Sequence, residues 1–225
     1  MVYLMVEQQF AKYPWCQRAI RGIFEEVRKR RIHVQEVSEL PGGAEERSCV
    51  LLVGASEEWI NQTARGAGSL GLHPIVLSNR ETNSSGLSVS SVKMDIHSSM
   101  ELAVDYLRTL GRERLALFGV NPSASSDLWR ARRFGELTGR EGDVFFLGSS
   151  VNEIFDQFYE KIHRYDGVIC ASDYAAVSLV GRLREKNYAI PEKLYVVGYG
   201  DMFLSRLFRP SITSISDDYE SFGKA

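Results

Sequence analysis

The sequence has few of the features that mark export or membrane insertion. Its 225 residues include only three cysteines, Cys16, Cys49 and Cys170, and no Cys-x-x-Cys pair. An odd number of widely spaced cysteines predicts reduced thiols and a cytoplasmic protein. No run approaches the roughly 18 apolar residues that cross a bilayer. The short apolar N-terminus lacks the basic region and the cleavage site of a signal peptide.

An excess of positive charge is also missing. The chain carries 27 basic and 29 acidic side chains, a formal net charge of −2. A stand-alone DNA-binding domain usually has a basic excess. We therefore expect that this chain does not by itself bind phosphate backbones.

Enzyme signatures are scarce. There is no phosphate-binding loop, no Gly-x-Gly-x-x-Gly after a strand, and no Gly-x-Ser-x-Gly elbow. The four histidines share no metal-ligand spacing. The sequence predicts neither an enzyme nor a cofactor or metal site. Its 44% of hydrophobic residues still provide the core of an ordinary globular protein.

Apolar strands alternate with amphipathic helices along the whole chain. We expect strands over 2–6, 33–37, 49–53, 74–77, 115–118, 144–147, 168–171 and 195–197. Helices are expected over 16–31, 59–67, 98–110, 128–137, 150–162 and 174–186. This order predicts an α/β fold of two doubly wound parallel-sheet lobes. The expected division is 1–118, to which 217–225 return, and 119–216.

Local signals refine three of these boundaries. Ser98-x-x-Glu101 and Ser150-x-x-Glu153 match capping boxes at helix starts. Gly111 suits the left-handed position after a helix. The stretch 81–91 is rich in Ser, Asn and Gly and is typical of an extended loop.

Ligands of parallel α/β sheets bind beyond the carboxyl ends of the strands, so the residues that follow strands are the candidates. Trp15 could stack on a ligand or pack beneath its own loop, and the sequence favours neither. Asp173 could accept hydrogen bonds from a ligand, but the sequence alone favours helix capping. Arg130 and Arg132 could reach a ligand or lie in solvent.

Several segments together resemble the effector-binding domain of LacI/GalR transcriptional regulators. The segments are 166–176 (DGVICASDYAA), 190–201 (IPEKLYVVGYGD), 209–219 (RPSITSISDDY), and Pro14-Trp15 with the following Ile-Arg-Gly-Ile. The resemblance covers essentially the whole chain, and the C-terminal segments taken together are specific. It implies a periplasmic-binding-protein-like fold of type I.

The resemblance also implies a function. A small effector, a sugar or a sugar-like molecule, would bind in the cleft between the lobes and control DNA binding by an attached head. The helix-turn-helix of that head is absent from this chain, and the family is expected to form homodimers. The alternative is a solute-binding protein of a sugar transport system, which shares the fold but requires export.

Carried over position by position, Trp15 matches the aromatic residue that lines the family's pocket, and Asp173 matches a position that contacts the effector. For the pocket arginine, Arg132-x-x-Gly135 fits one alignment and Arg130-x-x-x-Phe134 another, and we slightly prefer Arg132. Of the two aspartates that the family has after Val-Gly-Tyr, the first is Gly200 here and only Asp201 remains. This departure removes a hydroxyl acceptor.

Two further departures concern length. The loop of residues 7–13 is longer than the usual connection. The closing portion of the family's first lobe is also absent after Ala225. From that absence we expect an unfilled sheet edge or exposed apolar surface near 2–6 or 50–53.

Overall fold

The computed structural model describes residues 1–43, 48–78, 89–148 and 151–225. The chain forms two units, Met1–Met94 with Asp218–Ala225 (unit 1) and Asp95–Asp217 (unit 2). The expected division at residue 118 is therefore wrong. Helix α3 (Ile96–Thr109) belongs to unit 2, because its apolar face is buried with that unit's strands. The chain returns to unit 1 at Asp218, one residue later than expected.

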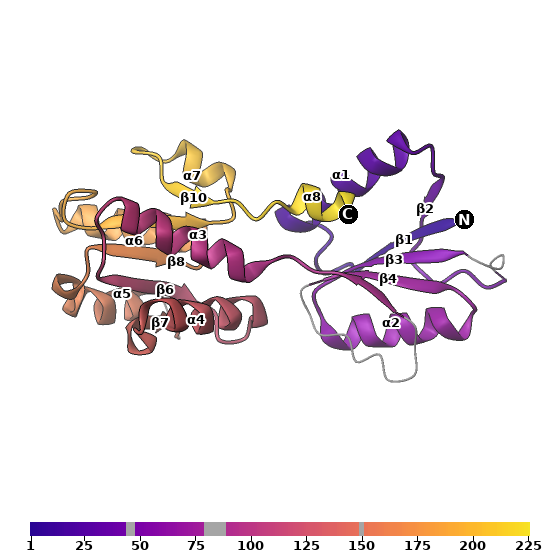
Figure 1. Ribbon diagram of the computed structural model, residues 1–225, viewed down its shortest axis with the longest axis horizontal. Coiled ribbons are helices and arrows are strands. Elements are labelled where there is room, and N and C mark those ends of the chain that lie inside the picture. The colour runs from indigo at the N-terminus through magenta and orange to yellow at the C-terminus, as the bar shows by residue number, and fades with distance from the viewer. Residues whose placement is uncertain (44–47, 79–88, 149–150) are drawn as a thin grey trace. The chain divides into compact units, whose positions relative to one another are not determined.

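The sheet of unit 1 consists of parallel strands in the order β2-β1-β3-β4-β5. They are β1 (Val2–Val6), β2 (Val34–Glu36), β3 (Cys49–Val53), β4 (His73–Leu77) and β5 (Ser90–Val92). Helices α1 (Pro14–Lys29) and α8 (Tyr219–Lys224) cover one face, and α2 (Glu57–Ser69) covers the other (Figure 1). Along β3, Val50 and Leu52 pack toward α2 while Val53 packs toward α1, so the strand is apolar on both faces.

This arrangement contradicts the expected open edge in unit 1. Strands β1 and β3 lie inside the sheet, each with a neighbour on both sides, and the edges are β2 and β5. Val50, Leu52 and Val53 are fully buried. Helix α8 contributes to the core on the face of Val53, where its Phe222 packs with Leu4 and the apolar face of α1.

Unit 2 has a second parallel sheet in the order β10-β9-β8-β6-β7. Its strands are β6 (Leu115–Val120), β7 (Val144–Phe146), β8 (Gly167–Cys170), β9 (Tyr195–Tyr199) and β10 (Thr213–Ile215). Its helices are α3, α4 (Ser125–Thr138), α5 (Val151–Glu160), α6 (Asp173–Glu185) and α7 (Phe203–Leu207), with short 3-10 turns at Glu141–Asp143 and Ile162–Arg164. Residues of α5 and α6 form one core with the sheet, and residues of α3 and α4 form another.

The local signals are confirmed in part. Gly111 has φ +72° after α3, as its C′ position requires. Helix α3, however, begins one turn before Ser98, and its cap is Asp95, whose carboxylate accepts a hydrogen bond from the Ser98 N–H. The capping box at Ser150 and residues 81–88 of the expected loop lie outside the described residues. The end of the expected loop is part of a strand, because β5 begins at Ser90.

Candidate functional site

The two sheets share one topology, in which the first strand lies between the second and the third. In such sheets the connections after the first and third strands leave in opposite directions, and the place between these two strands is called the switch point. Ligands bind beside it, at the carboxyl ends of the strands. The relevant strands are β1 and β3 in unit 1, and β6 and β8 in unit 2. The segments that follow β1 and β6 are therefore the candidate sites.

In unit 1 the switch point is occupied by Glu7, the residue directly after β1. Its carboxylate is almost fully buried. Oε2 accepts hydrogen bonds from the backbone N–H groups of Ala55 (2.9 Å) and Ser56 (3.0 Å), at the start of α2. The other oxygen accepts from the Ser56 hydroxyl and the Gln9 amide. One carboxylate thus joins the ends of β1 and β3 and fixes the loop that leads to α1.

The charge on Glu7 is stabilised by these bonds. Burial by itself raises the pKa of Glu7, but the hydrogen bonds from Ser56, Gln9 and Ala55 outweigh it and hold the pKa below its ordinary value. The N-terminus of α2 adds favourable dipole and N–H groups. Sequence reasoning missed this residue, because a lone glutamate after a strand carries no recognisable motif.

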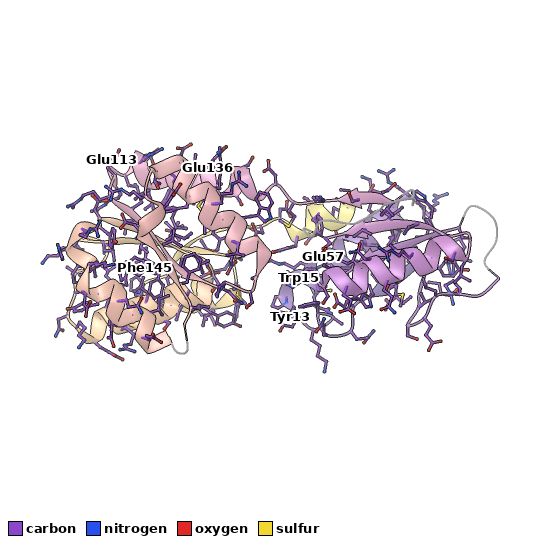
Figure 2. The ribbon with its side chains drawn as sticks, turned by 90° about the horizontal axis from the view of Figure 1, so that it is seen from below. Tyr13, Trp15, Glu57, Glu113, Glu136 and Phe145 are labelled. Carbon is purple, nitrogen blue, oxygen red and sulfur yellow. The ribbon has the colours of Figure 1, made fainter. Side chains whose placement is uncertain are left out.

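The loop after Glu7 brings aromatic side chains together. Trp15 at the start of α1 lies with its ring centroid 6.0 Å from that of Phe10 and 6.1 Å from that of Tyr219. Tyr13 lies close to Trp15 (Figure 2) and is about half exposed. Trp15 itself is partly buried against the core of unit 1. It therefore packs within its unit and keeps exposed surface as well.

In unit 2 the corresponding position is organised by Arg130. This guanidinium, on α4, donates from Nη1 to Asp127 (3.0 Å) and from Nη2 to Asp217 (2.8 Å). Its Cζ lies 4.3 Å from the centroid of the Tyr199 ring. The other oxygen of Asp127 accepts from the backbone N–H of Asn121, directly after β6 (3.0 Å). Arg130 thus joins the carboxyl ends of β6, β9 and β10.

Arg132 has the opposite surroundings. Its side chain is 70% exposed and pairs with Glu136 one turn along the same helix. Phe134, which belongs to the alignment that selects Arg130 as the pocket arginine, is fully buried in the core. The structure therefore favours Arg130 over Arg132 as the arginine at the carboxyl edge. The sequence could not distinguish them, because two arginines two residues apart differ only in which face of α4 is buried.

The sequence alone favoured Asp173 as a helix cap, and the resemblance placed its role as an effector contact above capping; in the structure Asp173 does not cap α6. The cap is Ser172, whose side chain accepts from the Ala175 N–H. The Asp173 side chain is fully buried, and it accepts from the Ser214 hydroxyl (2.6 Å) and the Met202 N–H (2.6 Å). It rests on Gly198, where an added Cβ would collide with its Oδ1. Both oxygens are thus used inside unit 2, where they hold β10 and the segment after β9.

Asp201 follows β9 together with Gly200, and both have positive φ, +46° and +111°. The Asp201 N–H donates to Ser214 (2.9 Å), while its carboxylate pairs with Arg206 of α7. The carboxylates nearest Arg130 therefore come from Asp127 and Asp217, which sequence reasoning did not single out. Asp217 lies within the 209–219 motif, but no strand was predicted there, so the sequence did not mark it as a residue that follows a strand.

Metal-ligand clusters and membrane-spanning helices are absent from the described residues. No group of three or more His, Cys, Asp or Glu side chains there could hold a metal ion. None of the helices in the described ranges has the length and apolarity to cross a membrane. All three cysteines are free thiols, as expected.

Comparisons with known proteins give a consistent result. The profile of a family described as a periplasmic binding protein-like domain matches residues 104–225. The HTH-type transcriptional regulator RegA of Clostridium saccharobutylicum is 33% identical over 86 residues, which are 38% of this chain and 22% of RegA. The matched segment thus spans about a fifth of that relative's length.

Solved structures extend the similarity in fold to the whole chain. A LacI transcriptional regulator from a Rhodococcus species has a TM-score of 0.74 at 22% identity, over 100% of this chain and 87% of that one. A complex of the regulator CelR with cellobiose has a TM-score of 0.70 at 19% identity, over 99% of this chain and 74% of that one.

Proposed function

The chain belongs to the periplasmic-binding-protein-like family, and from this premise we propose that it is the effector-binding domain of a LacI/GalR-type transcriptional regulator and senses a sugar or sugar-like molecule. Effector binding would shift the population of conformations of this domain, and that shift would change the DNA affinity of an attached DNA-binding head. The similarity to a cellobiose-bound regulator supports the effector class.

The observation that carries this proposal is the buried Arg130 at the carboxyl end of the unit 2 sheet. It is held between Asp127 and Asp217 above the ring of Tyr199. We propose that effector hydroxyls bind to this group in unit 2. For unit 1 we propose, separately, that Trp15 contacts an apolar ligand face. Asp201 is a further candidate acceptor. We propose that Asp173 positions Met202 and Ser214 at this edge, and that the effector is bound by Arg130 rather than by the exposed Arg132.

The test is a thermal-shift screen of the 225-residue chain against neutral sugars, sugar phosphates, nucleosides and polyols. At least one class is expected to raise the melting temperature with a saturable dose dependence. Trp15→Ala should weaken that response at least tenfold, whereas Trp129→Ala, which removes an exposed tryptophan from α4, should leave it unchanged. A screen without any stabilising class would refute the sensor function.

The regulator assignment rests on relatives that are transcriptional regulators rather than enzymes or transport proteins. We propose that DNA is bound through a helix-turn-helix encoded ahead of this domain, and that the protein acts in the cytoplasm as a homodimer without catalysing a reaction. A signal sequence encoded there instead would favour the transport alternative. Sequencing the gene upstream of Met1 decides between them.

A further inference from the structure

Each switch point has donor groups that could bind an anion: backbone N–H groups at the start of α2 in unit 1, and the Arg130 guanidinium in unit 2. In both units, carboxylates of the chain itself already occupy these donors. In unit 1 the amide groups at the start of α2 would suit an anion. They are instead occupied by Glu7, whose Oε2 lies 2.9 Å from the Ala55 nitrogen and 3.0 Å from the Ser56 nitrogen. The only other charge on the loop of residues 7–13 is the exposed Lys12, and an exposed ammonium contributes little.

Unit 2 repeats this arrangement with different groups. Both terminal nitrogens of Arg130 are within 3.0 Å of a carboxylate oxygen, from Asp127 and from Asp217. One buried guanidinium between two carboxylates leaves a local net charge of −1. The second arginine at this edge, Arg206, is paired with Asp201. An anionic ligand at Arg130 would have to displace a carboxylate from a side chain that is itself less than a tenth exposed.

We infer that a ligand group bound at either of these two positions is uncharged, and that each position by itself discriminates against phosphate and carboxylate groups. This inference rests on the proposed function and narrows it to neutral ligands. Hydroxyl groups fit because they can donate to Asp127 and Asp217 without displacing Arg130. A phosphate would place a dianion beside these carboxylates, where charge repulsion is strong because the surroundings are partly desolvated.

The inference also accounts for Gly200. The family position after Val-Gly-Tyr lacks its aspartate here, yet the edge still has acceptor oxygens, because Asp127 and Asp217 provide them beside Arg130. The edge therefore has carboxylate oxygens without an aspartate at position 200. With φ +111°, Gly200 adopts a backbone conformation in which an aspartate would be strained.

The test measures binding of matched probes to the 225-residue chain by calorimetry: glucose against glucose 6-phosphate, and adenosine against adenosine 5′-monophosphate. Wild type should bind no phosphate more tightly than its neutral parent. Asp217→Asn frees one Arg130 nitrogen, and Glu7→Gln removes the charge at α2. Each should raise the ratio of phosphate to neutral affinity by about tenfold or more, the scale of one charge-assisted hydrogen bond.

The control is Asp166→Asn, which makes the same change in net charge at the opposite, amino end of β8, where Asp166 pairs with Arg114. It should leave the ratio at the wild-type value. A wild-type preference for phosphate, or a ratio in both variants no higher than in Asp166→Asn, would overturn the inference. Should neither probe pair nor any compound in the wider screen bind, the proposed function fails, and the inference falls with it.

Discussion

Arg130 and Arg132 lie two residues apart on α4, yet they differ in what surrounds the charge. Arg130 faces the sheet, where two carboxylates and the ring of Tyr199 replace water. Arg132 faces solvent beside Glu136. A buried guanidinium is tolerated only when carboxylates pair with it and accept its hydrogen bonds. The buried carboxylates in turn need the guanidinium. At the scale of single residues, removal of either arginine should therefore have very different consequences.

We expect Arg130→Met to lower the free energy of unfolding of unit 2 by about 3–5 kcal/mol, because Asp127 and Asp217 would be left as buried carboxylates without their cation. Arg132→Met is the matched control on the same helix and should change that free energy by less than about 1 kcal/mol. Urea unfolding followed by circular dichroism measures both. Equal effects would show that the Arg130 cluster contributes no more than a surface ion pair.

Glu7 gives unit 1 a pH dependence. Its pKa in the folded protein lies below the ordinary value of 4.5. Its ionised form therefore stabilises the fold above pH 4.5, and this contribution is lost as the pH falls through the folded-state pKa. Glu7→Gln should lower the melting temperature at pH 7, and the difference from wild type should shrink below pH 4.5. A difference that is constant between pH 7 and pH 3 would contradict this account.

At the scale of secondary structure, α8 is held to α1 by an approach that only glycine permits. A Cβ added at Gly22 would collide with the Glu220 carbonyl, and one added at Gly223 would collide with the Ala19 carbonyl. This close contact lets a six-residue helix bury Phe222 against the core of unit 1. The salt bridges of Lys224 with Glu25 and Glu220 add little, because these side chains are well exposed.

Gly22→Ala should therefore destabilise unit 1, because the backbone of α8 at Glu220 must move away from the added methyl group. This loss is expected although alanine favours helices more than glycine does. The expected loss is about 1–3 kcal/mol, as for other overpacked sites. The control is Gly181→Ala in α6, where an added Cβ meets nothing within 4 Å. That change should instead stabilise unit 2 by about 0.5–1 kcal/mol. Thermal unfolding of the two variants tests the opposite signs, and stabilisation by Gly22→Ala would refute this packing argument.

Length explains part of which elements the sequence predicted, although β2 and β7, with three residues each, were predicted as well. Strands β1 and β3 have the predicted bounds, because five apolar residues buried on both faces leave a continuous run. Strand β10 has only three residues, and α7 and α8 have five and six, too few for a period to be recognised. Only part of the candidate site could be predicted from the sequence. The aromatic Trp15 was singled out, whereas the partners of Arg130 depend on tertiary contacts between α4 and the residue after β10.

At the scale of the whole molecule, the surface of unit 2 carries apolar side chains that the fold itself does not use. Phe203 and Leu207 of α7 are 74% and 54% exposed, and Tyr174 of α6 is 62% exposed. Helices α6 and α7 are packed against each other, so these side chains belong to neighbouring elements. Exposed apolar side chains grouped in this way are typical of association surfaces. They give the proposed homodimer a location that can be tested.

If the chain dimerises through α6 and α7, sedimentation velocity at micromolar concentration should show a dimer for wild type and a monomer for Phe203→Glu. The introduced carboxylate would have to be buried without a partner, which few interfaces tolerate. Leu102→Glu on α3 is the control, because that side chain is 58% exposed on another helix of the same unit and should leave the dimer intact. A wild-type chain that sediments as a monomer, or a Phe203→Glu variant that remains dimeric, would contradict this surface. Circular dichroism of both variants separates lost association from lost folding.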